Sequence, residues 1–262
     1  MAYVRPTSLP IEVVTLDEQK NYLRVSTTRD DALISSMISA AREQAETFTN
    51  QAIAQRNYVQ ALDSFPYYVD TIMSQQAYPP NYYSNPRYST TLWNYSQMLK
   101  LFRGPLTDVV DITYVDGSGG NANDGTIQHL TEGVDFIVDP LNLQPRLFPL
   151  AGLFWPSVKF VPNAVLVNFT AGYTPNPTDV RTVTVHTNLS SPYVPDARPN
   201  QQTTYTYQIG VPYSLKLALQ MMVAHWYLNR EPIVAGTPGK LPSHMEDILW
   251  SFRVEDVSPT RG

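Results

Sequence analysis

One segment, residues 211–231 with the sequence VPYSLKLALQMMVAHWYLNRE, constrains the fold more than any other part of the chain. Pro212 lies at its start, where a helix tolerates a missing N–H, and Pro232 follows its end. Between the two prolines, apolar residues recur at three- and four-residue steps: Leu215, Leu219, Met222, Val223 and Trp226. The spacing predicts a helix of about five turns whose apolar face is wide enough to be covered on more than one side.

Charged residues are scarce: they make up 16% of the 262 residues, where about a quarter is typical. Their place is taken by 17 tyrosines, 22 prolines and many Asn, Gln and Thr residues, and only 5 of the 18 basic residues are lysine. Protein interfaces are enriched in aromatic residues and depleted in Lys and Glu. The composition therefore predicts a surface suited to protein contacts, and the net charge of −5 disfavours broad binding to a phosphate backbone.

The chain has no cysteine, which excludes disulfides and thiolate metal sites. Its first residues, MAYVRPTSLPIEV, lack the apolar core of a secretion signal. Residues 217–228 form the longest nearly apolar run, but Gln220 and His225 interrupt it and it is too short to span a bilayer. We therefore expect a soluble protein that is made in the cytoplasm.

Two helices are predicted near the N-terminus. Residues 15–18 form a capping box, in which the side chains of Thr15 and Glu18 each accept from the other residue's backbone N–H, and this helix should end near Arg24. Thr28 or Asp30 caps the next helix, whose apolar residues fall on one face. The linker is short, so the two helices should pack as a hairpin.

From residue 58 the apolar pattern changes to alternation, which predicts strands over residues 58–62, 98–102, 109–115, 136–138, 158–161 and 164–169. Two stretches are additions to this plan. Residues 66–97 carry seven tyrosines and four prolines without periodicity. Residues 174–210 contain two threonine-rich alternating runs around a proline-rich segment, which predicts a protruding β-hairpin arm.

The predicted fold is therefore α+β, with a helical bundle formed by N-terminal and C-terminal helices and an inserted antiparallel β-rich domain. Residues 1–56 should hold the N-terminal helices. Residues 57–210 should form the β-rich region, including the loop 66–97 and the hairpin arm 174–210. Residues 211–231 are the long core helix, and residues 232–262 are a C-terminal docking tail.

Motifs for catalysis, cofactors or metals are not recognisable. His129, His186, His225 and His244 lie in four different elements and in no metal-ligand spacing. The sequence DGSGGNANDG at residues 116–125 fails the spacing of a calcium loop and is interpreted as the tip of a β-hairpin. No P-loop, dinucleotide fingerprint or nucleophile elbow is present. We expect no catalytic, cofactor-binding or metal-binding residues, and no enzyme.

Asp108 and Asp111 are the acids with the most apolar neighbours, since they flank Val109 and Val110. Alternation along a strand places such acids on its solvent face. A carboxylate-based hydrolase is the competing hypothesis, and it would require a concave cluster of acids.

Several blocks of the sequence, in order, resemble one family: the head–tail connector proteins of tailed bacteriophages, also called neck adaptors or head-completion proteins. The matching blocks are LDEQKNYLR at 16–24; Asp30, Asp31, Leu33, Ile34, Ala40, Ala41, Arg42 and Glu46; RGPL at 103–106 leading into 109–116; AGY at 171–173; Pro212, KLA at 216–218, AHWY at 224–227 and NRE at 229–231; and Ile248, Leu249, Phe252 and Arg253. Residues 66–97 and 174–210 have no counterpart in the short form of the family, so their roles are not implied.

This resemblance implies a structural adaptor of a tailed phage virion. Such proteins form a ring, usually dodecameric, under the portal; the ring extends the DNA channel used in ejection and joins the capsid vertex to the tail. The implied partners are further copies of the chain, the portal protein and the next neck or tail protein. Duplex DNA would pass through the lumen without specific binding, and no cofactor or membrane is implied. The location would be the virion neck.

Two groups of candidate interface residues follow. Trp and Arg are frequent interface anchors, so the C-terminal tail is predicted to reach the portal, after a hinge at residues 236–239, through Ile248, Leu249, Trp250, Phe252 and Arg253. The competing interpretation is that these residues cap the chain's own helices. The arm is predicted to contact the tail or a neighbouring copy, where it could add a strand to another sheet, through Thr182, Thr184, Tyr205 and Tyr207.

A virion surface or receptor-binding protein is the alternative function. Its support is the set of loops rich in Tyr, Asn and Pro, which are typical of adaptable recognition surfaces. The mass of the assembled protein separates a ring from a trimer.

Overall fold

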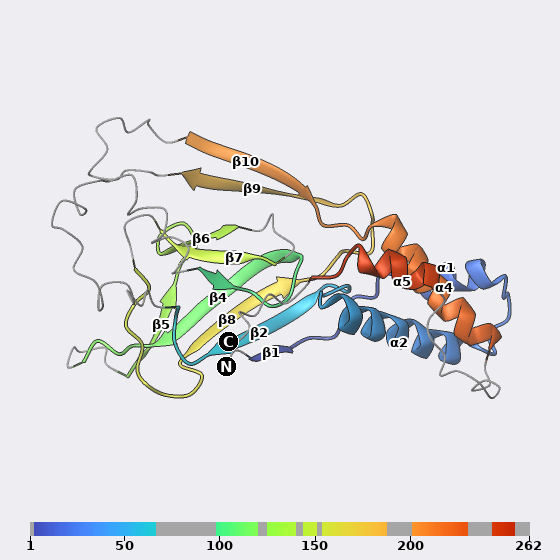
Figure 1. Ribbon diagram of the computed structural model, residues 1–262, viewed down its shortest axis with the longest axis horizontal. Coiled ribbons are helices and arrows are strands. Elements are labelled where there is room, and N and C mark those ends of the chain that lie inside the picture. Colours follow the sequence, from blue (N-terminus) through green and yellow to red (C-terminus); the bar gives the residue numbers. More distant parts are fainter. Residues whose placement is uncertain are drawn as a thin grey trace.

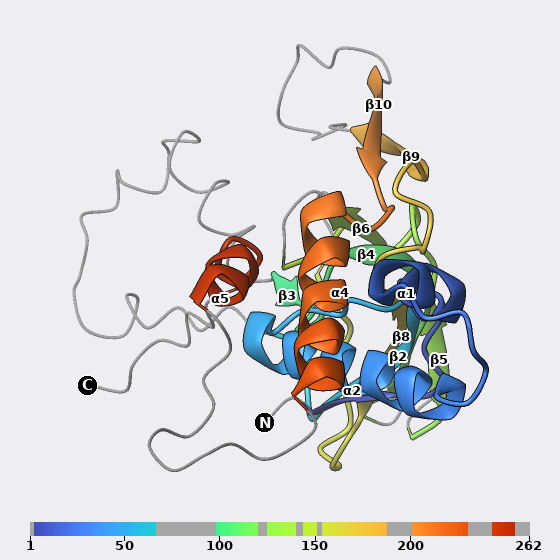
Figure 2. The same ribbon diagram turned by 90° about the vertical axis from the view of Figure 1, so that its right-hand side faces the viewer.

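The computed structural model describes residues 3–66, 98–119, 125–139, 144–150, 154–187, 201–229 and 243–254 (Figure 1). Helices gather at one end of an elongated molecule and strands fill the other end (Figures 1 and 2). Every pairing between named strands is antiparallel. The predicted α+β class with antiparallel sheets is therefore confirmed. The predicted loop 66–97, apart from Pro66, and the predicted hinge at residues 236–239 lie outside the described residues, as does the segment 230–242 around that hinge.

The helical end consists of α1 (Leu16–Leu23), α2 (Asp31–Thr49), α4 (Tyr213–Leu228) and α5 (Ser243–Trp250). Helices from the two ends of the chain thus share one core, because α2 and α4 pack together and α5 packs on both. The buried residues of this core include Val14, Ile34, Ile38, Leu215, Leu219, Met222 and Leu249.

The long helix predicted over residues 211–231 is confirmed as α4, with shorter ends. Pro212 lies just before it, at the N-cap, where its carbonyl accepts from the Lys216 N–H at 3.0 Å. The helix is apolar on nearly all sides, and α1, α2 and α5 cover only part of it. Tyr213, Leu217 and Leu228 remain 70%, 43% and 76% exposed.

The capping box of α1 is confirmed. The Glu18 carboxylate accepts from the Thr15 N–H at 3.0 Å, and the Thr15 hydroxyl accepts from the Glu18 N–H at 3.3 Å. The N-cap of α2 is Asp30, one of the two predicted residues, but its side chain makes no capping bond. The Asp30 carboxylate instead accepts from the Tyr227 hydroxyl at 2.6 Å and so ties α2 to α4.

The strands form a five-stranded sheet, a three-stranded sheet and a two-stranded ribbon. The five-stranded sheet has the order β1 (Tyr3–Pro6), β2 (Arg56–Leu62), β8 (Val165–Ala171), β4 (Leu106–Val115), β5 (Ile127–Leu130). The three-stranded sheet has the order β3 (Leu99–Lys100), β7 (Arg146–Pro149), β6 (Phe136–Asp139). The ribbon pairs β9 (Val180–Thr187) with β10 (Gln201–Gln208).

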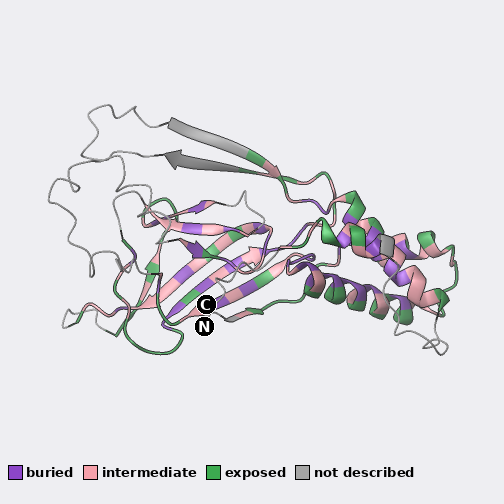
Figure 3. Ribbon diagram, viewed as in Figure 1, coloured by how far each residue is buried: buried purple, intermediate pink, exposed green. Residues whose placement is uncertain are grey.

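Alternate residues of β8 face the second core, between the five-stranded and the three-stranded sheets (Figure 3). Val165, Val167 and Phe169 are fully buried there, whereas Leu166 on the opposite face is 36% exposed. Such one-sided burial is common for antiparallel sheets. The remaining large buried side chains of this core include Phe65, Leu101, Leu106, Ile112, Phe136 and Leu147.

The strand predicted over residues 158–161 is wrong. Val158 makes only an isolated bridge to Asp116. Pro162 lacks an N–H, and Asn163 has a φ of 56°, so the chain turns there before β8 begins. The short strands β1, β5 and β7 were not predicted, although β6, which has the same length, was.

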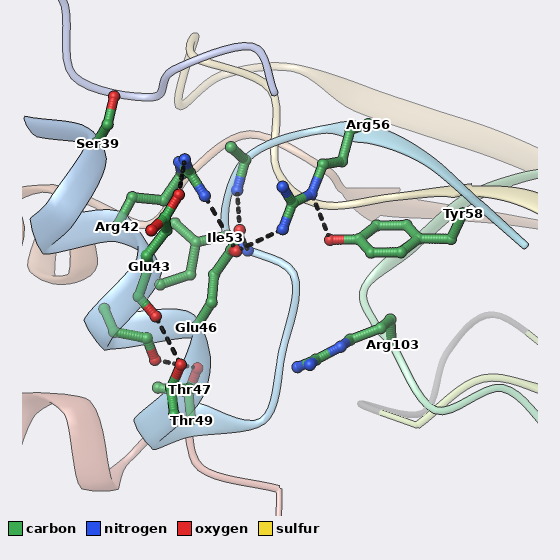
Figure 4. A network of polar contacts seen from close by, with 12 residues as sticks. Ser39, Arg42, Glu43, Glu46, Thr47, Thr49, Ile53, Arg56, Tyr58 and Arg103 are labelled. Atoms are coloured by element: carbon green, nitrogen blue, oxygen red, sulfur yellow. Dashed lines mark hydrogen bonds and ion pairs between the residues drawn. The ribbon is translucent and has the colours of Figure 1, made fainter. Parts of the chain in front are cut away.

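A buried carboxylate, that of Glu46, joins the helical end to the sheet end (Figure 4). One of its oxygens accepts from the N–H groups of Ile53 at 3.1 Å and Ala54 at 3.2 Å. The other pairs with the guanidinium groups of Arg42 at 3.1 Å and Arg56 at 2.7 Å. Glu46 and Arg42 belong to α2 and Arg56 begins β2, so a single side chain fixes the helix, the following turn and the strand.

The charged side chains around Glu46 make further ion pairs and hydrogen bonds. Arg42 also donates to Glu12 at 3.1 Å. Burial alone would lower the pKa of Arg42, but the carboxylates of Glu46 and Glu12 outweigh this effect and raise it. Burial, and then the Glu46 charge, raise the pKa of Tyr58, whose hydroxyl accepts from Arg56. Removal of Glu46 would deprive both arginines of the one anion that they share.

The Glu46→Gln substitution should lower the free energy of unfolding by about 3–5 kcal/mol, because the buried Arg42 and the partly buried Arg56 then lose their common anion. Glu43→Gln is the matched control, since Glu43 contacts the same guanidinium at 3.3 Å but its side chain is 69% exposed. Its effect should stay below about 0.5 kcal/mol. Urea unfolding followed by circular dichroism measures both values. Equal effects of the two substitutions would contradict the role given to Glu46.

Acid should weaken the contact between α1 and α4. The Glu18 carboxylate accepts from the Lys216 ammonium at 2.6 Å as well as from the cap. Burial alone would raise the pKa of Glu18, but Lys216 and Thr15 lower it below its ordinary value of 4.5. The stabilisation is therefore complete above pH 4.5 and is lost as the pH falls through the lower value of the folded state.

The Glu18→Gln variant should therefore lose less thermal stability than the wild type as the pH falls below 4.5. The difference should be small, because the Glu18 side chain is 42% exposed. The melting temperature measured from pH 7 to pH 3 tests this expectation. Asp17→Asn, on the same turn of α1, is the control and should keep the wild-type dependence. An unchanged pH dependence of Glu18→Gln would show that the Lys216 contact does not matter in solution.

Candidate assembly surfaces

The cavity beside the ribbon is too small for a substrate. A cavity where the ribbon meets β4 has a volume of about 10 Å³. That is room for about one water molecule, whereas small-molecule sites usually measure about 300–1,000 Å³. It is lined by Leu106, Asp108, Val109, Glu132, Val138, Arg181 and Tyr207.

The described residues contain no group of three or more His, Cys, Asp or Glu side chains that could hold a metal ion. His129 pairs with Asp111 at 3.1 Å, and His225 contacts the Asn229 amide at 3.2 Å. The side chains of His186 and His244 lie outside the described part of the chain.

The glycine-rich segment 116–125 joins β4 to β5, which pair in a β-hairpin, as predicted. The Asp116 carboxylate accepts from the N–H of Ser118 at 2.9 Å and from its hydroxyl at 3.0 Å. This acid therefore holds the turn locally. Residues 120–124 lie outside the described part.

The five predicted portal contacts divide into two groups. Leu249 is fully buried in the helical core, and Ile248 and Phe252 pack against that core. Trp250 is 50% exposed, and Arg253 is exposed beside it. The first three residues hold α5 on the chain's own helices, and Trp250 and Arg253 are the most exposed of the five.

Trp250 and Arg253 form a stacked surface with a third residue, Phe48 of α2. The Arg253 guanidinium lies 4.5 Å from the Trp250 ring centroid and 5.6 Å from that of Phe48. The two rings meet edge to face at 5.6 Å. We call these three residues the α5 surface. Phe48 is more than 200 positions away in the sequence, so no local pattern could assign it to this surface.

Among the residues described, the ribbon is fixed at one end only to the sandwich, by which we mean the five-stranded and three-stranded sheets with the core between them. Arg181 of β9 pairs with Asp108 of β4 at 2.7 Å, and the Tyr207 hydroxyl of β10 donates to the Leu106 carbonyl at 3.3 Å. Burial raises the pKa of Tyr207. Beyond these contacts the two strands extend away from the rest of the molecule (Figures 1 and 2).

The predicted contact residues of the ribbon therefore differ in accessibility. Thr182 is exposed and shares a hydrogen bond with Thr206 at 3.2 Å. Tyr207 is half-buried and holds the attached end of the ribbon. Thr184 and Tyr205 lie further along the strands, and their side chains are outside the described part.

The two aspartates of β4 are accessible, as predicted, but strict alternation would put residues three apart on opposite faces; the register of β4 with β8 shifts between Val109 and Asp111. Asp108 is exposed and pairs with Arg181. Asp111, which is partly exposed, pairs with His129. Each aspartate thus pairs with a basic side chain of another strand, and the two do not form the concave cluster of acids that a carboxylate-based hydrolase would require.

Within the described ranges, no helix has the length and apolar character needed to cross a bilayer.

Several known proteins are similar to this chain. Three chains from gene transfer agent particles share its fold over 99% of its length. One is from the "Neck of empty GTA particle computed with C6 symmetry" (17% identity, TM-score 0.59, 100% of that chain). Another is from the "Neck of native GTA particle computed with C12 symmetry" (16% identity, TM-score 0.59, 100% of that chain). A third is from the "Virion of native gene transfer agent (GTA) particle" (16% identity, TM-score 0.58, 99% of that chain).

Sequence comparison adds a family over part of the chain. No curated protein matches the sequence. Residues 13–78 match the family described as "Phage gp6-like head-tail connector protein", and this stretch includes α1 and α2, which carry two of the resembling blocks. The resemblance to head–tail connectors is thus confirmed over these residues: residues 13–78 are similar to the phage gp6-like head–tail connector family.

Proposed function

We propose that this chain is a structural head–tail adaptor of a tailed, phage-like virion and has no catalytic role. It forms a ring under the portal, extends the DNA channel and joins the capsid vertex to the tail. The observation that carries the proposal is the match of residues 13–78 to the head–tail connector family.

Two further observations support a ring. The chain shares its fold, end to end, with chains from particle necks computed with C6 and C12 symmetry, so we infer about twelve copies. A subunit in a ring is covered by neighbours on both sides, which suits a surface with 16% charged residues and many tyrosines.

The partners follow from the two surfaces. We assign the portal protein to the α5 surface, because stacked Trp and Arg side chains are typical anchors of an interface. The ribbon faces the next neck or tail protein or a neighbouring copy. Duplex DNA passes through the lumen without specific binding, since the net charge of −5 disfavours adhesion to phosphates. The protein is made in the host cytoplasm and resides in the virion neck.

Particles assembled without this chain should contain heads and free tails that have not joined, because the adaptor between them is missing. Electron micrographs of a mutant lysate test this expectation, and supplying the chain in trans should restore joining. Complete tailed particles that only fail to attach to cells would instead support the receptor-binding alternative and overturn the adaptor function.

The α5 surface should bind the portal without stabilising the subunit much. The double substitution Trp250→Ala and Arg253→Ala should weaken binding to isolated portal rings at least about tenfold. It should lower the unfolding free energy by less than about 1.5 kcal/mol, since Trp250 is half exposed. Sedimentation with portal rings and urea unfolding measure the two effects.

Leu249→Ala is the contrasting variant, because Leu249 is fully buried and its truncation should cost about 2–5 kcal/mol of stability. Val134→Ala is the surface control; Val134 is 61% exposed on the sheet end, and its truncation should change neither quantity. Portal binding that survives the double substitution would remove the α5 surface from the interface.

A further inference from the structure

The two edges of the ribbon are unpaired in the described part of the chain. β9 and β10 pair with each other in a continuous register from Val180 with Gln208 to Thr187 with Gln201, and neither joins another sheet. Each strand has eight residues, a length of about 27 Å. Only the end near Arg181 and Tyr207 is tied to the sandwich.

Such a ribbon is not stable by itself. A two-stranded hairpin is marginal in water, and three or more strands, or packing on another element, are needed. The edges also lack the residues that normally prevent pairing with another chain, namely Lys, Glu, Asp and Pro within the strand. The sequences VRTVTVHT and QQTTYTYQ contain one arginine and one histidine, and the arginine already pairs with Asp108.

The two edge strands of the five-stranded sheet, β1 and β5, do carry such protection. β1 ends in Pro6, includes Arg5 and has four residues. β5, at the opposite edge, also has only four residues. Short strands, proline and charge are the usual protections of an edge. The ribbon thus presents the longest and least protected strand edges among the described residues.

We propose that the ribbons of adjacent copies pair edge to edge, β9 of one copy with β10 of the next, and close into one β-barrel around the axis of the ring. The inference rests on the ring of the proposed function. In a ring, the contact between neighbours is heterologous, so one edge of a copy meets the opposite edge of the next. Ribbons related by rotation point the same way, and β9 and β10 run in opposite directions. The new pairing is therefore antiparallel, like the pairing within each ribbon.

The size of this barrel suits a channel. Twelve copies, the symmetry of one neck with the same fold, contribute about 24 strands. At about 4.8 Å between strands the circumference is at least about 115 Å, which gives a diameter of about 37 Å between opposite backbones. Barrels of 16–18 strands already enclose an aqueous channel. The wall would be made of Thr, Val, Tyr and Gln residues, whose neutral side chains do not hold DNA in place.

The absence of cysteine allows a direct test by cross-linking. Thr182→Cys is co-assembled into rings with a second variant that carries Cys in place of Thr204, Thr206 or Gln208. These three positions are two residues apart, so they cover different registers between copies. After mild oxidation, one of the three mixtures should give a covalent dimer at up to about a quarter of the interfaces, as random mixing in a ring allows.

Each variant assembled alone should give no dimer, because β9 does not meet β9 in this arrangement. The matched control is Ser35→Cys on the exposed face of α2, mixed with the same β10 variants, and it should also give none. Dimers of Thr182→Cys alone, or no dimer in any of the three mixtures, would overturn the barrel.

Two measurements keep this result separate from the adaptor function. The mass of the assembly before oxidation reports the ring: if no ring forms, the proposed function fails, whereas a ring without cross-links contradicts the barrel alone. Hydrogen exchange of the unmodified chain gives an independent readout. Peptides covering β9 and β10 should gain protection at both strand edges on assembly, and unchanged exchange in intact rings would exclude the pairing.

Discussion

The carboxylate of Glu46 is the contact on which the arrangement of the molecule depends. It is buried where α2 ends and β2 begins, and it binds two arginines and two backbone N–H groups at once. A buried charge is costly unless its partners are all in place, so the geometry of this junction has little freedom. The helices and the sheets therefore keep a fixed relation, and so do the two surfaces proposed for assembly, the α5 surface and the ribbon.

The two surfaces use different physical means. The α5 surface is a small set of stacked rings and one cation, held on the helical core by Leu249 and its neighbours. The ribbon offers backbone N–H and C=O groups along two strand edges. The first mode suits a pocket in a different protein, because its side chains are large and distinctive. The second suits an identical partner, since backbone pairing needs only a complementary edge.

Local patterns explain how much of the fold was predictable. The capping box at Thr15, the apolar spacing in α2 and α4, and the alternation in β2, β4 and β8 each lie within one element, and the structure has all of them. The strand expected at residues 158–161 failed because Pro162 and Asn163 turn the chain. The short strand β1 was missed because its pairing with β2, more than 50 residues later, creates it.

The sequence by itself determined the class of the fold, its long helices and the resemblance of residues 13–78 to head–tail connectors, because capping, periodicity and family motifs are all properties of neighbouring residues. Only the tertiary structure decided which side chains are accessible. It buried Leu249, left Trp250 exposed and brought Phe48 beside it. It also left the ribbon edges unpaired among the described residues. These outcomes depend on contacts between distant segments, whose geometry is set by packing and by the buried charges around Glu46 rather than by local sequence.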